Sequence, residues 1–126
     1  MTERLKINNS RELENNLKTL LSAYDPKQVF VLCDSNSSAH CLPLISGLPC
    51  LSEAMHITIP AGDENKNIDT LTSIWSFLSN NGGTRKSLLI NLGGGMITDM
   101  GGFAAACFKR GITQLAAKST NTITTG

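Results

Sequence analysis

A glycine-rich turn constrains this chain more than any other feature. Residues 91–102, NLGGGMITDMGG, place three glycines directly after the apolar run SLLINL, and Asp99 follows four residues later. A strand, a bare turn and a helix together present unpaired backbone N–H groups and the positive helix end at one point. Glycine lets a ligand approach the backbone closely, so the segment predicts a site for the anionic oxygens of a diphosphate. A tight turn with close helix packing at Gly101 and Gly102 remains the alternative, since neither the G-x-G-x-x-G fingerprint nor a P-loop is present.

The rest of the chain alternates strand and helix patterns. Run 29–33 is apolar on both faces, which is typical of a buried parallel strand. Met55–Ile59 forms a second, shorter strand pattern and Ser87–Leu92 forms a third. Helical patterns are expected over residues 8–25, 68–79 and 96–111, with Asn9 and Glu12 as a capping box, and a short helix is expected near 39–46. The pattern predicts an α/β domain, Rossmann-like, with a mainly parallel sheet and flanking helices.

Composition excludes several classes of protein. The 126 residues fit one domain, and a net charge of +1 gives no basic stripe for nucleic acid. No apolar run approaches the roughly 20 residues of a membrane span, and the N-terminus lacks a signal peptide, so we expect a cytoplasmic protein. The cysteines (Cys33, Cys41, Cys50 and Cys107) have no C-x-x-C spacing, and we expect reduced, structural thiols and no metal site within this chain.

Polar clusters follow each of three predicted strands. The first contains Asp34 and Asn36, the second runs from Gly62 to Lys66, and the third is the glycine turn. Ligands of parallel sheets sit at the carboxyl ends of the strands, so the clusters should converge on one edge. Taken singly, each residue is typical of a solvated loop. Jointly they favour a nucleotide: the first cluster would hold a ribose, Lys66 would supply positive charge and Asp99 would face ribose hydroxyls or an amide.

Residues 93–112, GGGMITDMGGFAAACFKRGI, closely resemble the signature of the 3-dehydroquinate synthase family, G-G-G-x-x-x-D-x-x-G-F-A-A-x-x-x-x-R-G-[IV]. The segment CDSN resembles the family's D-x-N after its early strand. The segment AGDENK resembles its G-E-x-x-K loop, with Asp63 in the place of glutamate. Other sugar-phosphate cyclases and the glycerol dehydrogenase group share only G-G-G-x-x-x-D, so the longer match favours 3-dehydroquinate synthase.

The resemblance implies an enzyme of the shikimate pathway, in aromatic amino-acid biosynthesis, that uses NAD and a divalent metal, zinc or cobalt, and forms a homodimer. Its reaction converts 3-deoxy-D-arabino-heptulosonate 7-phosphate to 3-dehydroquinate and phosphate, by transient oxidation, phosphate elimination and aldol cyclisation. The resemblance also assigns roles. Asp34 and Asn36 would contact the adenosine side of NAD. Arg110 would reach the substrate phosphate from a neighbouring subunit, or be an ordinary cation near a helix C-terminus. The remaining cofactor contacts would be Gly62, Asp63, Lys66, Gly94, Gly95, Met96, Ile97, Thr98 and Asp99.

The resemblance ends at residue 112. Residues 113–126, TQLAAKSTNTITTG, lack the family's P-T-T-L-L-A and are poor in large apolar side chains. We therefore expect a partial NAD-binding domain over 1–112 and a poorly ordered, non-family tail over 113–126 that cannot readily supply the next strand. The family's metal and substrate residues lie in a region with no counterpart here, so we expect no catalytic residue and no turnover from this chain alone.

An incomplete sheet would expose the edge of the strand at 87–92 or of its neighbour, which predicts self-association. Two other functions stay open. One is a different NAD- and metal-dependent sugar-phosphate cyclase or polyol dehydrogenase. The other is a non-catalytic nucleotide-binding module.

Overall fold

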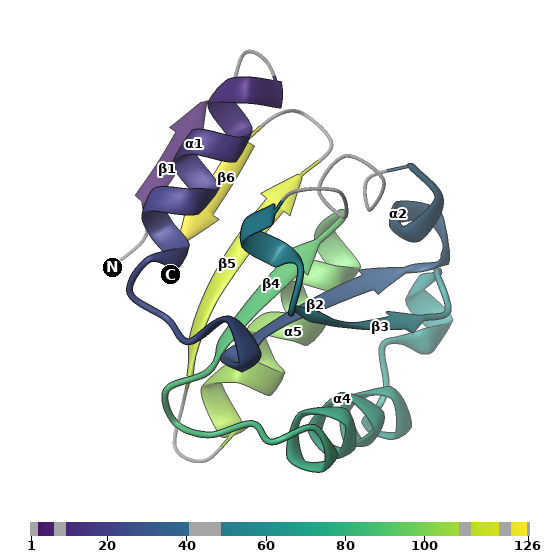
Figure 1. The fold of residues 1–126 in the computed structure, drawn as a ribbon. Helices are drawn as coiled ribbons and strands as arrows, with labels where there is room; N and C mark the ends of the chain where they lie inside the picture. The colour runs from purple at the N-terminus through teal and green to yellow at the C-terminus, as the bar shows by residue number, and fades with distance from the viewer. Residues whose placement is uncertain (1–2, 7–9, 41–48, 109–111, 119–121, 126) are drawn as a thin grey trace.

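The apolar runs identified in the sequence form the centre of a six-stranded sheet with the strand order β1-β6-β5-β4-β2-β3. The computed structural model describes residues 3–6, 10–40, 49–108, 112–118 and 122–125 (Figure 1). Strands β3, β2, β4 and β5 are parallel, whereas β6 and β1 are antiparallel additions at one side. The strand bounds are β1 Glu3–Lys6, β2 Val29–Asp34, β3 Met55–Ile59, β4 Leu88–Leu92, β5 Thr113–Lys118 and β6 Thr122–Thr125. The predicted α/β class with a mainly parallel sheet is confirmed.

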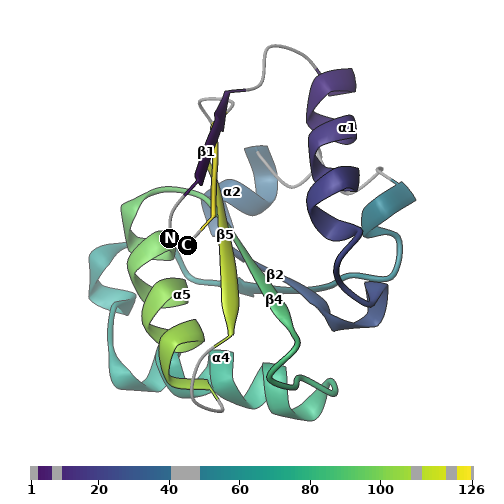
Figure 2. The same ribbon diagram turned by 90° about the vertical axis from the view of Figure 1, so that its left-hand side faces the viewer.

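Helices cover both faces of this sheet. Figure 2 shows α1 on one side and α5 on the other, with the strands between them. The helix bounds are α1 Ser10–Leu21, α2 Ser35–His40, α4 Ile68–Asn80 and α5 Gly95–Cys107, and three short 3-10 turns are η1 Pro26–Gln28, η2 Pro49–Leu51 and η3 Asp63–Asn65. The prediction of a helix from Ile68 is confirmed, and Asn67 caps it by accepting a hydrogen bond from the backbone N–H of Thr70 at 3.0 Å.

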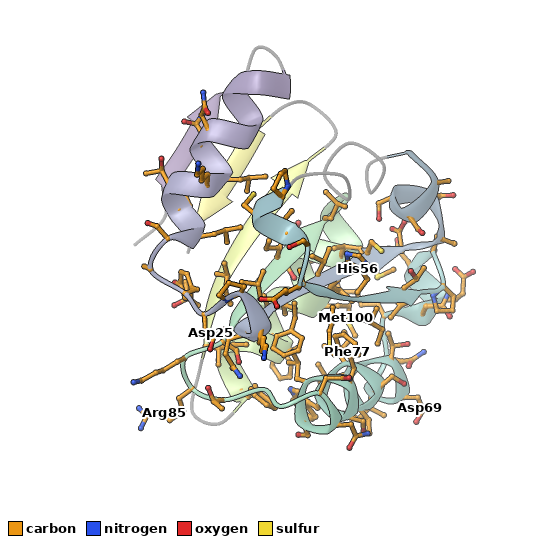
Figure 3. All side chains as sticks on the ribbon, in the orientation of Figure 1. Asp25, His56, Asp69, Phe77, Arg85 and Met100 are labelled. Atoms are coloured by element: carbon orange, nitrogen blue, oxygen red, sulfur yellow. The ribbon has the colours of Figure 1, made fainter. Side chains whose placement is uncertain are left out.

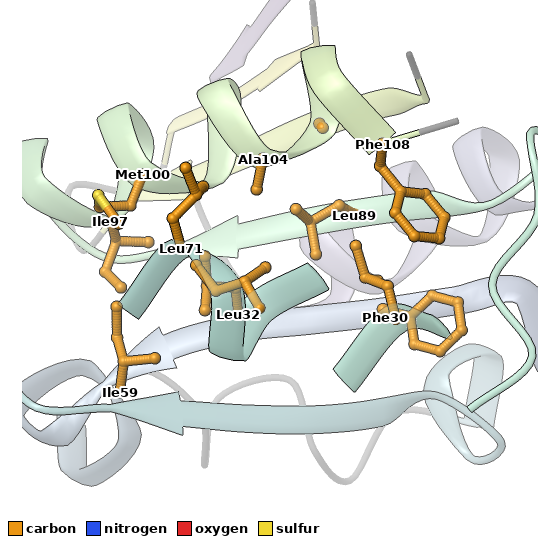
Figure 4. Packing of buried hydrophobic residues seen from close by; sticks show 12 residues of the cluster. Phe30, Leu32, Ile59, Leu71, Leu89, Ile97, Met100, Ala104 and Phe108 are labelled. Carbon is orange, nitrogen blue, oxygen red and sulfur yellow. The ribbon is translucent and has the colours of Figure 1, made fainter. Parts of the chain in front are cut away.

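The central strands contribute alternate side chains to two cores, because successive side chains of a strand point to opposite faces. One face of β2 and β4 packs against α1 through Leu17 and Leu21. The other face packs against α4 and α5 (Figure 4), in a cluster formed by Phe30, Leu32, Ile59, Leu71, Ile74, Leu78, Leu89, Ile97, Met100, Ala104, Ala105 and Phe108. Burial of β2 on both faces is what the uninterrupted apolar run 29–33 predicted.

The expectation that the tail could not supply the next strand is wrong. Residues 113–118 form β5, which pairs with β4 in the register Leu88↔Thr113 to Leu92↔Ala117. Backbone pairing needs an N–H and a C=O from each residue and no large side chain, and residues 113–125 contain no proline to interrupt it. The prediction of an exposed edge at β4 is therefore wrong, because β4 lies between β2 and β5 inside the sheet.

The short helix expected near 39–46 begins earlier. The structure places α2 at Ser35–His40, directly after β2, and residues 41–48 lie outside the described residues. The reason is local, since the carboxylate of Asp34 accepts hydrogen bonds from the N–H groups of Asn36 and Ser37 at 2.9 and 2.7 Å and so caps the helix. The predicted capping residue Asn9 also lies outside the described part of the chain.

Candidate functional site

Three predicted polar clusters meet at the carboxyl edge of the sheet, because β2 lies between β3 and β4. The register pairs Asp34 with Ile59 and Cys33 with Leu92, so the three strands end side by side. Each then leads into a different element: β2 into α2, β3 into the loop that contains η3, and β4 into the glycine turn and α5. The convergence expected from the sequence is therefore present in the fold.

The glycines of the turn differ in what the fold requires of them. Gly93 is buried with φ of +147°, and a Cβ there would lie 3.2 Å from Ser37 Oγ. The backbone conformation and the packing of the fold therefore both favour glycine at this position. Gly94 and Gly95 are exposed, and a Cβ on either would meet no atom within 4 Å. Nothing within the described chain explains the lack of a side chain at these two positions.

Gly94 is the N-cap of α5 and, as a glycine, gives the first turn of the helix no side-chain hydrogen bond. The N–H of Thr98 donates to the carbonyl of Gly94 at 3.0 Å, and the Thr98 hydroxyl donates to the same oxygen at 3.1 Å. Ile97 is fully buried in the core, so only its backbone can contact a ligand, and Met96 is half-buried. The helix start thus offers backbone amides to an anionic group.

The end of β2 is braced by serines that the sequence interpretation missed. Ser37 is buried, and its hydroxyl accepts a hydrogen bond from the N–H of Asp34 at 2.8 Å. The Ser35 hydroxyl accepts one from the N–H of Ala61 at 3.0 Å, which ties the first loop to the second. Asn36 is exposed. The signal was available, because small hydroxyl residues after a strand-ending aspartate are typical of a capped helix start.

The second loop is connected to α5 by an ion pair. Lys66 Nζ lies 2.8 Å from Asp99 Oδ2, and the two side chains are 47% and 59% exposed. The hydrogen bond and the charge of Asp99, with a smaller contribution from Asp63, raise the pKa of Lys66 above its ordinary value of 10.5. Gly62 opens this loop with φ of +110°, a conformation that side chains rarely adopt.

Other predicted features contribute less. Arg110 lies outside the described residues. Among the residues that the structure does describe, no three His, Cys, Asp or Glu side chains are grouped so that they could hold a metal ion. His56 lies on the edge strand β3 (Figure 3), and Cys33 and Cys107 are free thiols. In the described part of the chain, no helix is both long and apolar enough to cross a membrane.

Solved structures identify the class of fold. A crystal structure of 2-deoxy-scyllo-inosose synthase with carbaglucose-6-phosphate, NAD+ and Co2+ matches 82% of this chain and 30% of its own, with 19% identity and a TM-score of 0.62. The 2-epi-5-epi-valiolone synthase of Streptomyces hygroscopicus, with NAD+ and Zn2+ bound, matches 72% of this chain and 26% of its own at 17% identity and a TM-score of 0.59. The fold is that of the sugar-phosphate cyclases and related dehydrogenases.

Sequence comparison narrows this class. The family model described as 3-dehydroquinate synthase N-terminal matches residues 56–124, a range that continues well beyond residue 112. The 3-dehydroquinate synthase of Parabacteroides distasonis is 47% identical over 105 residues, which cover 83% of this chain. The chain belongs to the 3-dehydroquinate synthase family. It spans about 30% of the length of that relative.

Proposed function

We propose that this chain forms the NAD-binding portion of a 3-dehydroquinate synthase. The parent enzyme converts 3-deoxy-D-arabino-heptulosonate 7-phosphate to 3-dehydroquinate and phosphate. The observation that carries the NAD site is the pair Gly94 and Gly95, whose missing side chains leave open space at a helix start that no N-cap side chain bonds. A diphosphate fits such a position, since backbone amides and the helix dipole favour anionic oxygens.

The roles of the surrounding residues follow from their positions. The N–H groups at the start of α5 would bind the diphosphate, and Asp99 would face the nicotinamide ribose. Asp34 and Asn36, at the end of β2, would hold the adenosine side, with one oxygen of Asp34 already engaged in capping α2. Gly62, Asp63 and Lys66 would complete the site from the second loop. When bound, NAD supplies reversible hydride transfer, and the residues named here only hold and orient it.

The described residues do not fit the divalent metal of the family, because they offer no group of three suitable ligands. We propose that the metal and most of the substrate contacts belong to regions of the relatives that this chain does not match, and that residues 1–126 alone do not turn over. Arg110 would contact the substrate phosphate. The 47% identity to a 3-dehydroquinate synthase favours this reaction over that of another cyclase or of a polyol dehydrogenase.

Titration of the purified chain with NAD by calorimetry tests the proposal. We expect saturable binding to the wild type and weaker binding to Asp99→Ala. Gly95→Leu should fold normally, because its Cβ meets no neighbour and leucine is a good helix former. The new side chain would, however, fill the space that the diphosphate needs, so binding should fall by about 100-fold or more, a loss of about 2.8 kcal/mol of binding free energy.

Ser76→Leu is the matched control, since it adds the same side chain at an exposed position of α4. It should bind NAD as the wild type does. Wild-type affinity in Gly95→Leu would show that the glycine turn is not the diphosphate site. No binding to the wild type at millimolar NAD would contradict the cofactor role of this chain.

A further inference from the structure

The end of helix α4 contains the one Asn-Gly pair of the sequence, Asn81-Gly82. Asparagine before glycine is chemically unstable, because the backbone nitrogen of the glycine can attack the amide carbon of the asparagine side chain. Glycine has no side chain to hinder this approach, and it gives the backbone the freedom that ring closure needs. The pair precedes β4, so it lies at the opposite end of that strand from the glycine turn.

The backbone nitrogen of Gly82 is free to react. The N–H groups on either side of it are both engaged. Asn81 donates to the carbonyl of Phe77 at 3.2 Å, and the N–H of Gly83 donates at 2.8 Å to that of Leu78. The N–H of Gly82, in contrast, donates to no residue in the described part of the chain. Gly82 is also exposed, with φ of +82°, and a Cβ there would meet no atom within 4 Å.

One hydrogen bond holds the side chain of Asn81. Its Nδ2 donates to the carbonyl of Phe77 at 2.8 Å, and the residue is half-buried with ψ of 23°. Ring closure requires a rotation about ψ that brings the amide carbon of Asn81 next to the nitrogen of Gly82, so this bond has to open first. Opening is easy at this position, because the last turn of a helix frays.

Asn36 shows how the fold protects a comparable pair. It is exposed and precedes Ser37, so the sequence makes this pair prone to the same reaction. The N–H of Ser37, however, donates to the carboxylate of Asp34 at 2.7 Å, and Ser37 is itself buried. The nitrogen that would attack Asn36 is therefore engaged, whereas the nitrogen that would attack Asn81 is not.

We propose that Asn81 is a site of spontaneous deamidation in the folded protein. The nitrogen of Gly82 loses its proton to a base from solvent and forms a bond to Cγ of Asn81, and the side-chain nitrogen leaves as ammonia. Water then opens the succinimide ring. Attack at Cγ gives aspartate, and attack at the backbone carbonyl gives isoaspartate. The reaction needs only water, and the inference does not depend on the proposed NAD site.

Both products place a carboxylate where Asn81 has an amide. This negative charge would lie at the C-terminal end of α4, where the helix dipole disfavours it. The hydrogen bond from Nδ2 to the carbonyl of Phe77 would also be lost. Deamidation therefore adds one negative charge and weakens the last turn of α4 as the protein ages.

Peptide mapping by mass spectrometry tests the proposal on the whole chain. One sample is incubated in its native state for several days at mildly alkaline pH, and a second is incubated in guanidinium chloride, which removes any protection by the fold. We expect aspartate and isoaspartate at residue 81 in both samples, but conversion of Asn36 only in the denatured one. Gly82→Ala should slow the conversion of Asn81 by about tenfold, an increase of about 1.4 kcal/mol in the activation free energy.

Asn36 serves as the internal control, since it is measured in the same samples. If Asn81 stays unmodified in the native sample, the bond to Phe77 protects it and the inference fails, whatever the denatured sample shows. Equal conversion of Asn36 and Asn81 in the native protein would also contradict the inference, because the free N–H of Gly82 would then not distinguish the two pairs.

Discussion

Replacing Gly101 by alanine tests how α5 packs on the sheet. Gly101 lies in the middle of α5 and is buried against Asn91, a fully buried residue of β4. A Cβ on Gly101 would lie 1.8 Å from Asn91 Oδ1, 2.4 Å from its Cγ and 2.9 Å from its Nδ2. Real Cβ atoms do not approach other heavy atoms so closely, so the helix or the asparagine must move.

The expected cost combines three effects. Overpacking a filled core costs about 1–3 kcal/mol, and displacing a buried polar group adds about 1–3 kcal/mol. The higher helix propensity of alanine offsets up to about 1 kcal/mol of this loss of stability, because alanine is a better helix former than glycine. We therefore expect Gly101→Ala to lower the free energy of unfolding by about 3 kcal/mol, a large share of the 5–15 kcal/mol that a domain typically has.

Urea denaturation followed by fluorescence measures this loss. The single tryptophan, Trp75, is half-buried and its indole N–H donates to the carbonyl of Ala104 on α5, so it reports on this packing. At a urea slope of about 2 kcal/mol/M, the midpoint should fall by about 1.5 M. Gly95→Ala is the control, and we expect it to be neutral or to stabilise by about 0.5 kcal/mol, because its Cβ meets no neighbour.

A Gly101→Ala variant as stable as the wild type would refute the steric reasoning. The same reasoning predicts that the stability losses of Gly101→Ala and Asn91→Ala depend on each other. In a double variant with Asn91→Ala, the added methyl has room, so the combined loss should be smaller than the sum of the single losses by about 1–3 kcal/mol. Additive losses would show that the asparagine is not the obstacle.

Three further outcomes are expected. Trp75→Phe should cost about 1 kcal/mol in unfolding followed by circular dichroism, because the 3.1 Å bond to Ala104 is lost. Gln28→Ala should cost about 1–2 kcal/mol in the same assay, because Gln28 donates to the carbonyl of Gly82 at 2.8 Å and accepts from two hydroxyls of the loop that precedes β4. The pKa of Lys66 is raised by Asp99, so the pair is fully formed below the ordinary lysine value and is lost as pH rises through the raised one. Asp99→Asn should therefore move the NMR titration of Lys66 to lower pH, and an unchanged titration would contradict the pairing.

The central elements could be predicted because their side-chain patterns are strong. A run of apolar residues on both faces identified β2, and helical spacing of apolar residues identified α4 from its first residue. α2 was expected several residues too late because SNSSAH has no apolar periodicity. That helix depends on a cap from Asp34, so its signal is polar and local.

Amino-acid composition alone does not predict β5. The small side chains of residues 113–118 argue against a buried strand, yet β5 is defined by backbone pairing with β4 and by its position in the sheet. Strand formation depends on the neighbouring strand that offers a partner, and propensity alone is a weak guide. The ion pair between Lys66 and Asp99 was likewise beyond prediction, because 33 residues separate them and only the strand order brings their loops together.

The glycines of the signature illustrate how the structure separates two explanations that the sequence left open. Gly93 and Gly101 serve the fold, since a side chain at either would strike Ser37 or Asn91. Gly94 and Gly95 have open space around them, and this space is the observation on which the proposed cofactor site rests. The tight-turn interpretation therefore holds for Gly93 and Gly101, whereas the proposed diphosphate site rests on Gly94 and Gly95. Substitution should separate them in the same way: a side chain at Gly95 should abolish cofactor binding in a stable protein, whereas one at Gly101 should lower stability first.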